Sequence, residues 1–159
     1  MVRMILNSML LSFFAGWCLV AQAQTDAYGP PITLDNAKQV AAKAAETARK
    51  HKYRVAIAIV DTAGHLVYFE KLDDTQTASV EVAIAKARSA STYRRETKAF
   101  ETALSKGRTA ILGLPGAVPI EGGIPLINEG KVIGAIGVSG VTSEQDGQVA
   151  RAGADSLAQ

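Results

Sequence analysis

The sequence predicts an α+β domain, with an antiparallel sheet of about five strands flanked by helices. Three observations predict this class. Two pairs of short apolar runs, rich in β-branched residues, are each joined by a brief turn, which is typical of β-hairpins. The predicted helices precede and follow these hairpins in groups, whereas a doubly wound parallel sheet alternates single strands with single helices. Finally, alanines recur at helical spacing, which favours helices packed closely on a sheet.

The N-terminal segment has the pattern of a secretory signal peptide. Arg3 supplies a positive charge, residues 4–20 are mostly apolar, and Ala21-Gln22-Ala23 has the small-x-small form of a cleavage site. We expect cleavage after Ala23, the alternative being an uncleaved anchor helix. Residues 1–23 would then be the signal peptide, 24–32 a linker and 33–159 the domain. With no second hydrophobic span, we expect a periplasmic or secreted protein without stable membrane insertion.

Composition excludes several classes of function. Cys18 is the only cysteine and lies within the predicted signal peptide, so we expect neither a disulfide nor a thiolate in the mature chain. Without Arg3 the chain carries 16 basic and 15 acidic residues, a balance that argues against a nucleic-acid partner. Roughly 136 residues remain, which suffices for one domain of ordinary size.

The first half of the domain is predicted to be a helix followed by a hairpin. Thr33 is a suitable N-cap, and apolar residues follow it at helical spacing. Residues 55–60 form an apolar run typical of a strand buried on both faces. A turn at 62–65 leads into an alternating strand at 66–70.

The second half is predicted to be two helices, a hairpin and a final helix. Thr142 and Gln145 have the spacing of a capping box at the start of the last helix, with Ser143 and Asp146 as a second register. The expected ranges are helices at 76–93 and 97–106, an irregular segment at 111–119, strands at 124–127 and 132–138 joined at 128–130, and a helix running to about 157.

Histidine chemistry is not indicated. Only His51 and His65 occur in the chain, and their spacing does not match a zinc site. No nucleophile triad is legible either. We interpret both histidines as solvated surface residues.

A basic group is the first candidate site. Its members are Lys86, Arg88, Arg94, Arg95 and Lys98, with Tyr93 among them. Arginines bind carboxylates through two hydrogen bonds, lysines act as point charges, and a tyrosine can stack on a planar ligand. The alternative is a solvated helix end whose positive charge suits the helix dipole. The sequence leaves both interpretations open.

Glu121, next to Gly122-Gly123, is the second candidate. Its carboxylate could transfer protons or bind a cation. We slightly favour the alternative, a structural ion pair with one of the arginines. The glycines at 137 and 140 do not form a phosphate-binding P-loop, although backbone N–H groups there would suit an anion.

Six stretches of the chain together resemble the GlcG/HbpS family of haem-binding proteins, which includes the C-terminal domain of PduO. The most specific are Glu-Gly-Gly-Ile-Pro at 121–125 and Gly-Val-Ser-Gly-Val-Thr-Ser-Glu-Gln-Asp at 137–146. The stretches follow the family's order and span nearly the whole predicted domain: 60–66, 83–88, 94–99, 114–116, 119–125 and 134–146.

The resemblance implies a profilin-like α+β domain, a homo-oligomer, and binding of haem or a related tetrapyrrole. In one secreted relative a threonine coordinates the haem iron, and the matching residue here is Thr97. Tyr93, Arg94, Arg95 and Lys98 would then border the ligand, the basic side chains near its propionates. Glu96 stands where many relatives have proline, so we expect a less rigid and less positive loop before Thr97.

Three functions follow as hypotheses. The first is an exported haem- or tetrapyrrole-binding protein acting as a carrier, scavenger or sensor. The second is a small-molecule enzyme or accessory protein, linked to glycolate or corrinoid chemistry, with Glu121 as acid or base. The third is a ligand-free oligomeric scaffold. We favour binding over catalysis.

Overall fold

The computed structural model describes residues 27–158, so the predicted signal peptide and its cleavage site lie outside the described residues. The order of elements confirms the predicted sequence of helices and hairpins. In chain order they are β1 (Ala27–Tyr28), α1 (Leu34–Lys50), β2 (Ala56–Val60), β3 (Leu66–Lys71), α2 (Ser79–Tyr93), α3 (Thr97–Ser105), the 3₁₀ helix η1 (Thr109–Gly113), β4 (Gly123–Asn128), β5 (Lys131–Ser139), α4 (Ser143–Ala154) and the 3₁₀ helix η2 (Asp155–Ala158).

The sheet has five strands, with β5 at its centre. β5 pairs antiparallel with β4 along one side and with β2 along the other, and β2 pairs antiparallel with β3. The exception is β1, which lies parallel to the start of β5, with Ala27 opposite Lys131 and Tyr28 opposite Val132. β1 thus forms inside the segment predicted to be a linker. Two residues give too short a pattern to be recognised in a sequence.

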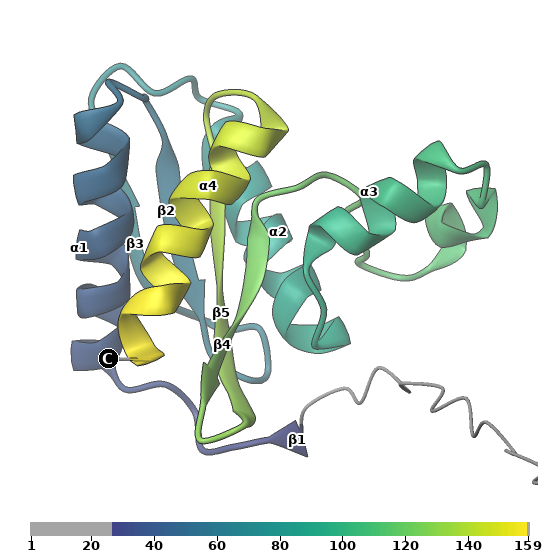
Figure 1. Ribbon diagram of the computed structural model, residues 1–159, viewed down its shortest axis with the longest axis horizontal. Coiled ribbons are helices and arrows are strands. Elements are labelled where there is room, and N and C mark those ends of the chain that lie inside the picture. Colours follow the sequence, from purple (N-terminus) through teal and green to yellow (C-terminus); the bar gives the residue numbers. More distant parts are fainter. Residues whose placement is uncertain (1–26, 159) are drawn as a thin grey trace, which may run out of the picture.

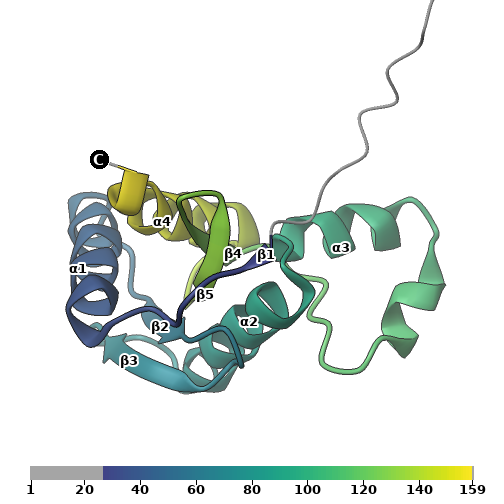
Figure 2. The ribbon, with the colours of Figure 1, turned by 90° about the horizontal axis from the view of Figure 1, so that it is seen from below.

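Helices cover both faces of the sheet. α1 and α4 lie together on one face, and α2 lies on the other (Figures 1 and 2). The larger core fills the first interface with alanines of α1, branched residues of the strands, and Val149 and Ala150 of α4. The second interface is mostly alanine, as the alanine-rich sequence predicted, and joins Ala83, Ala87 and Ala90 of α2 to the strands.

Gly137 explains why α2 lies so close to the sheet. A Cβ atom at this position of β5 would lie 2.1 Å from the carbonyl oxygen of Ala83 and 2.5 Å from the amide nitrogen of Ala87. Only a residue without a side chain allows the helix backbone to approach the strand this closely.

Local signals fix the ends of two helices. Thr33 caps α1 through its side chain, which accepts a hydrogen bond from the amide of Asn36. Thr142 and Gln145 form the predicted capping box at the start of α4. α2 begins at Ser79, later than predicted, because the amide of Ser79 closes a turn onto the carbonyl of Gln76.

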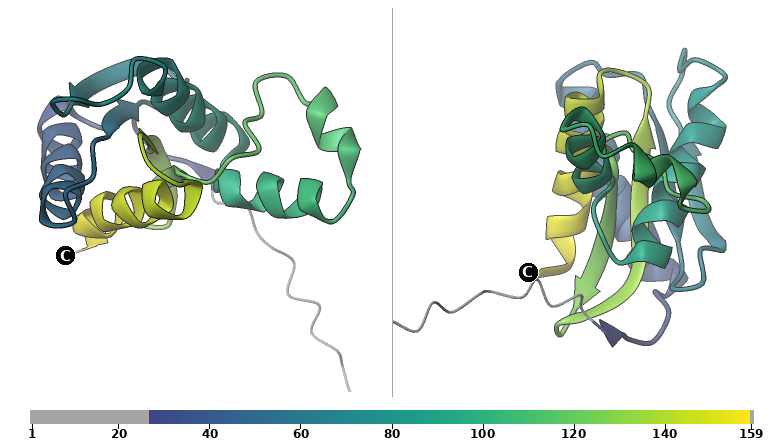
Figure 3. Two further views of the ribbon diagram at one scale, coloured as in Figure 1. Left: turned by 90° about the horizontal axis from the view of Figure 1, so that it is seen from above. Right: turned by 90° about the vertical axis from the view of Figure 1, so that its right-hand side faces the viewer.

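α3 and η1 form an arm that projects from the layered body (Figures 1 and 3). η1 occupies part of the segment predicted to be irregular. Leu112 on the arm is 66% exposed. Among residues 27–158, no helix is both long and apolar enough to span a bilayer.

Candidate ligand-binding site

A pocket of about 680 Å³ lies where α2 turns into α3, beside the outer edge of β4. Its volume is within the range of small-molecule sites. Four cationic side chains and one carboxylate line it together with apolar groups: Arg94, Arg95, Glu96, Lys98, Ala99, Thr102, Ile124, Pro125, Ile127 and Arg151.

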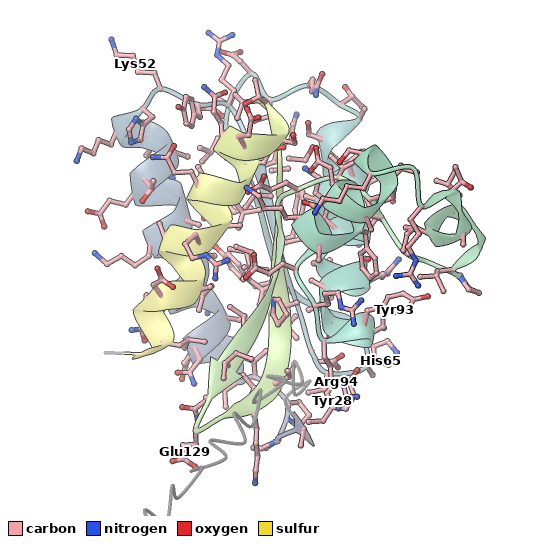
Figure 4. The ribbon with its side chains drawn as sticks, turned by 45° about the vertical axis from the view of Figure 1, so that its right-hand side comes forward. Tyr28, Lys52, His65, Tyr93, Arg94 and Glu129 are labelled. Carbon is pink, nitrogen blue, oxygen red and sulfur yellow. The ribbon has the colours of Figure 1, made fainter. Side chains whose placement is uncertain are left out.

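The end of α2 sets the position of Arg94. This residue is the C-cap and has left-handed backbone angles, φ 48° and ψ 44°, a conformation that glycine usually adopts. The guanidinium of Arg94 lies over the ring of Tyr28, 5.1 Å from its centroid (Figure 4). The Tyr28 hydroxyl lies 2.9 Å from the carbonyl oxygen of Ser91 and 3.1 Å from that of Thr92, and donates to them. The short strand β1 therefore holds the end of α2 in place.

Arg95 is the most available cation of the pocket. Its side chain is exposed, and its guanidinium lies 5.7 Å from the centroid of the Phe100 ring. Within residues 27–158 its charge has no carboxylate partner at ion-pair distance. An arginine in this state can bind a ligand carboxylate without first breaking an ion pair.

Two ion pairs hold the remaining cations. The Lys98 amine lies 2.9 Å from a carboxylate oxygen of Glu121, and the hydrogen bond and charge of Glu121 raise the pKa of Lys98. Arg151 of α4 pairs with Glu96 at the start of α3. These pairs connect α3 to the β4 and α4 side of the pocket.

The apolar part of the pocket comes from β4. Ile124, Pro125 and Ile127 lie on this strand, which pairs with β5 on one side only. Proline is tolerated here because an edge strand has no partner waiting for the missing N–H group.

Glu121 is part of a structural ion pair, the interpretation we favoured, but its partner is Lys98 and not an arginine. Its backbone amide also donates to Glu101 over 2.6 Å. A Cβ atom on Gly147 would lie 2.3 Å from Glu121 Oε1, so the carboxylate packs directly on α4. Glu121 borders a neighbouring hollow with Lys98 and Glu144 and does not line the pocket.

Thr97 and Tyr93 are beside the pocket and do not line it. The Thr97 side chain is fully buried, and its hydroxyl accepts a hydrogen bond of 2.9 Å from the amide of Gly123. The Tyr93 hydroxyl donates to the carbonyl of Pro115, and its ring meets Phe100 edge-on. Of the six predicted site residues, the structure thus brings Arg94, Arg95 and Lys98 into the pocket.

The predicted basic group does not hold together as one surface. Lys86 is only 1% exposed, and its amine lies 2.8 Å from a carboxylate oxygen of Asp146. The same amine donates to the carbonyl of Val138 over 3.0 Å. Arg88 donates to the carbonyl of Gly64 at the β2–β3 turn, away from the pocket.

Sequence reasoning missed Arg151 and the β4 edge as parts of this site. Arg151 is far from α3 in the chain, and nothing in the local pattern of α4 indicates which element its side chain meets. The sequence indicates Asp146 only as a possible helix cap. In the structure its carboxylate also accepts a hydrogen bond from the buried amine of Lys86.

The fold and the pocket together define a class: a layered α+β domain with a pocket that is lined by cationic side chains and by apolar residues of a strand edge. The family described as "Haem degrading protein HbpS-like" matches residues 32–155, and the chain belongs to this family. Protein GlcG of Escherichia coli K12 is 42% identical over 108 residues, which cover 68% of this chain and 81% of GlcG.

Solved structures agree with this assignment. ORFY of Klebsiella pneumoniae superposes with a TM-score of 0.76 at 29% identity, covering 82% of this chain and 92% of ORFY. A double mutant of Streptomyces reticuli HbpS gives 0.74 at 29% identity, covering 87% and 95%. A complex of PduOC with heme gives 0.72 at 24% identity, covering 80% and 95%, and shows a shared fold.

The pocket fits one part of haem better than another. Its cations suit carboxylate side chains and its β4 floor suits an apolar ring. The pocket offers fewer suitable ligands to the iron. The lining residues contain no histidine, cysteine, methionine or tyrosine, and the residues 27–158 hold no cluster of acidic, histidine or cysteine side chains able to bind a metal ion.

Proposed function

We propose that this protein binds haem or a related tetrapyrrole in the pocket between α3 and β4, as an exported carrier, scavenger or sensor. One observation carries the proposal: exposed arginine at the α2–α3 corner faces an apolar strand edge across a pocket of about 680 Å³. A tetrapyrrole with propionate groups has the matching chemistry, a flat apolar ring with carboxylates on one side. Family membership and the PduOC complex with heme support the same choice.

The chain's own residues would act by holding and orienting the ligand. Arg95 and Arg94 would bind carboxylates, while Ile124 and Pro125 would contact the ring. Haem, when bound, supplies an iron centre able to take part in redox chemistry. The carboxylate of Glu121 forms an ion pair with Lys98. This arrangement supports a ligand-binding function of the protein better than one in which Glu121 transfers protons.

Export and self-association are further parts of the proposal. The signal-peptide pattern of residues 1–23 supports export to the periplasm or beyond. The exposed apolar side chains of the arm, Leu112 and Leu114, support a homo-oligomer in which the arm meets another copy.

Replacing Arg95 with glutamine is expected to weaken haemin binding about tenfold at low salt, since one charge-assisted hydrogen bond is lost. Titrating the purified protein with haemin and following the Soret band against a free-haemin blank measures this. Arg54→Gln is the matched control. Arg54 lies in a different pocket, opposite Asp74, and its replacement should leave the affinity unchanged. Equal effects of both substitutions would contradict the site.

Replacing Arg94 with glycine should separate binding from stability. Glycine relieves the left-handed backbone, worth about 1–2 kcal/mol, but loses the contact with Tyr28, worth about 0.5–1 kcal/mol. We expect the free energy of unfolding to stay within about 1 kcal/mol of the parent, and haemin affinity to fall severalfold.

Lys52→Gly is the matched control for this substitution. Lys52 is also a basic residue with positive φ, 58°, just after a helix, and it lies at the other end of the molecule (Figure 4). Urea unfolding should give a similar small change, and haemin titration should give none. A loss of affinity in Lys52→Gly would mean that the ligand binds elsewhere.

A further inference from the structure

We infer that the pocket recognises the carboxylates and ring of its tetrapyrrole and not the metal, so that a metal-free porphyrin binds as well as haemin. This inference rests on the proposed function, which it narrows from haem to carboxylated tetrapyrroles as a class. It departs from the expectation that Thr97 coordinates iron, and the reasons lie in the donors that surround the pocket.

Among residues 27–158, the usual iron-binding side chains are absent from the pocket lining. Cys18 and the three methionines, Met1, Met4 and Met9, all precede residue 27 in the predicted signal peptide. His51 caps the end of α1, and its ring stacks on the ring of Tyr53. Tyr53 lines a different pocket from the one between α3 and β4. The common axial ligands of haem proteins are therefore not supplied by the residues that line this site.

His65 is the other histidine of the sequence. Its turn packs on the last turns of α2, where Asp61 and Gly64 accept hydrogen bonds from Ser91 and Arg88. The imidazole itself is 80% exposed, and its Nδ1 lies 3.4 Å from a carboxylate oxygen of Asp61, outside the pocket lining. It is the one histidine that the experiment has to test.

The oxygen donors beside the pocket are already engaged. The Tyr93 and Tyr28 hydroxyls donate to backbone carbonyls, at 2.7 Å from Pro115 and 2.9 Å from Ser91. The Thr97 hydroxyl is fully buried against the Gly123 amide. To reach a metal, Thr97 would have to leave this hydrogen bond, and the buried amide of Gly123 would lose its partner.

Of the described residues that line the pocket, Lys98 is the only one with an amine, and it is held as a cation. Its ion pair with Glu121 favours the protonated form, which has no lone pair to offer a metal. Two oxygen donors also line the pocket, the Glu96 carboxylate, which is paired with Arg151, and the Thr102 hydroxyl, and neither side chain is a common axial ligand of haem iron. The other polar groups are guanidinium and ammonium groups, and these bind anions.

Three ligands test the inference with the purified protein: haemin, protoporphyrin IX and protoporphyrin IX dimethyl ester. Porphyrin fluorescence and absorbance would follow binding. We expect protoporphyrin IX to bind within about threefold of haemin, and the dimethyl ester to bind at least about tenfold more weakly than protoporphyrin IX. Arg95→Gln should weaken haemin and protoporphyrin IX by the same factor.

The outcomes separate the inference from the proposed function. Haemin binding that is about 30-fold tighter than protoporphyrin IX binding would overturn the inference and leave the proposed function standing. The substitutions His65→Ala and Thr97→Val would then show which side chain binds the iron. Only the loss of that side chain should abolish the preference for haemin over protoporphyrin IX. If neither haemin nor protoporphyrin IX binds, both the proposed function and the inference fail.

Discussion

Replacing Lys86 with methionine is expected to lower the free energy of unfolding by about 3–5 kcal/mol, because it leaves the carboxylate of Asp146 buried without its cation. The two side chains are 1% and 3% exposed, and their charged atoms lie 2.8 Å apart. Methionine matches the length of the lysine stem, so the loss is chiefly electrostatic. Urea unfolding followed by circular dichroism measures the change.

Lys43→Met is the matched control for this substitution. Lys43 also pairs with a carboxylate, that of Glu46, at 2.9 Å, but the two side chains are 54% and 69% exposed. Exposed pairs of this kind contribute about 0–1 kcal/mol, so the variant should unfold almost as the parent does. Similar losses of stability in both variants would show that burial does not increase the contribution of the Lys86–Asp146 pair.

The cost of Lys86→Met should depend on pH in one direction. Burial raises the pKa of Asp146, while Lys86 and the amides of Val141 and Gly140 oppose the rise. Without Lys86 the folded pKa rises further above the unfolded value, 3.8. Stability is then greatest below the unfolded pKa and is lost as the pH rises through the folded pKa. The deficit against the parent should therefore grow from acid toward neutral pH.

A second substitution tests the cause of the loss. Asp146→Asn, added to Lys86→Met, removes the buried charge while keeping an oxygen that can accept from the Val141 amide. We expect the double variant to recover at least about half of the lost stability, since both charges are then gone. A double variant as unstable as Lys86→Met would assign the loss to packing.

Lys86 also shows where the sequence misled. The sequence predicts a basic group that includes Lys86 and leaves open whether it binds a ligand or is a solvated helix end, and in both interpretations the amine is accessible. Charged residues are rarely buried unless they are paired. Yet Lys86 lies three residues after Ala83 and four before Ala90, within the alanine stripe that packs on the sheet. This position was the available signal. The partner could not be predicted, because Asp146 is sixty residues away in the chain.

Elements that depend on local pattern were predicted well. The hairpins, the buried strand at 56–60 and the capping box at Thr142 each have their cause within a few neighbouring residues. The pocket has no such local cause. Arg95, Ile124 and Arg151 are distant in the chain, and only the packing of α3 and α4 against β4 makes them line one pocket. For the same reason the motif could indicate Thr97 as an iron ligand without showing that its hydroxyl already accepts a hydrogen bond from the amide of Gly123.

Replacing Gly137 with alanine is expected to destabilise the fold by about 3 kcal/mol or more, the upper range for overpacking a close-packed interface. The new methyl group would meet backbone atoms of α2, at 2.1 Å from the Ala83 carbonyl oxygen and 2.5 Å from the Ala87 amide nitrogen. Backbone cannot rotate away as a side chain can. α2 would have to lift off the sheet, which would disturb the Lys86–Asp146 pair and displace Arg94 and Arg95 at its end.

Gly113→Ala provides the control, because a methyl group there would meet no atom within 4 Å. Thermal unfolding should show a large fall in the midpoint for Gly137→Ala and little change for Gly113→Ala. Haemin titration of Gly137→Ala below its melting range adds a second readout. Since Arg94 and Arg95 directly follow the end of α2, we expect the affinity of the variant to fall even where the protein remains folded. A stable variant with full affinity would mean that the spacing between α2 and the sheet is not what positions the pocket.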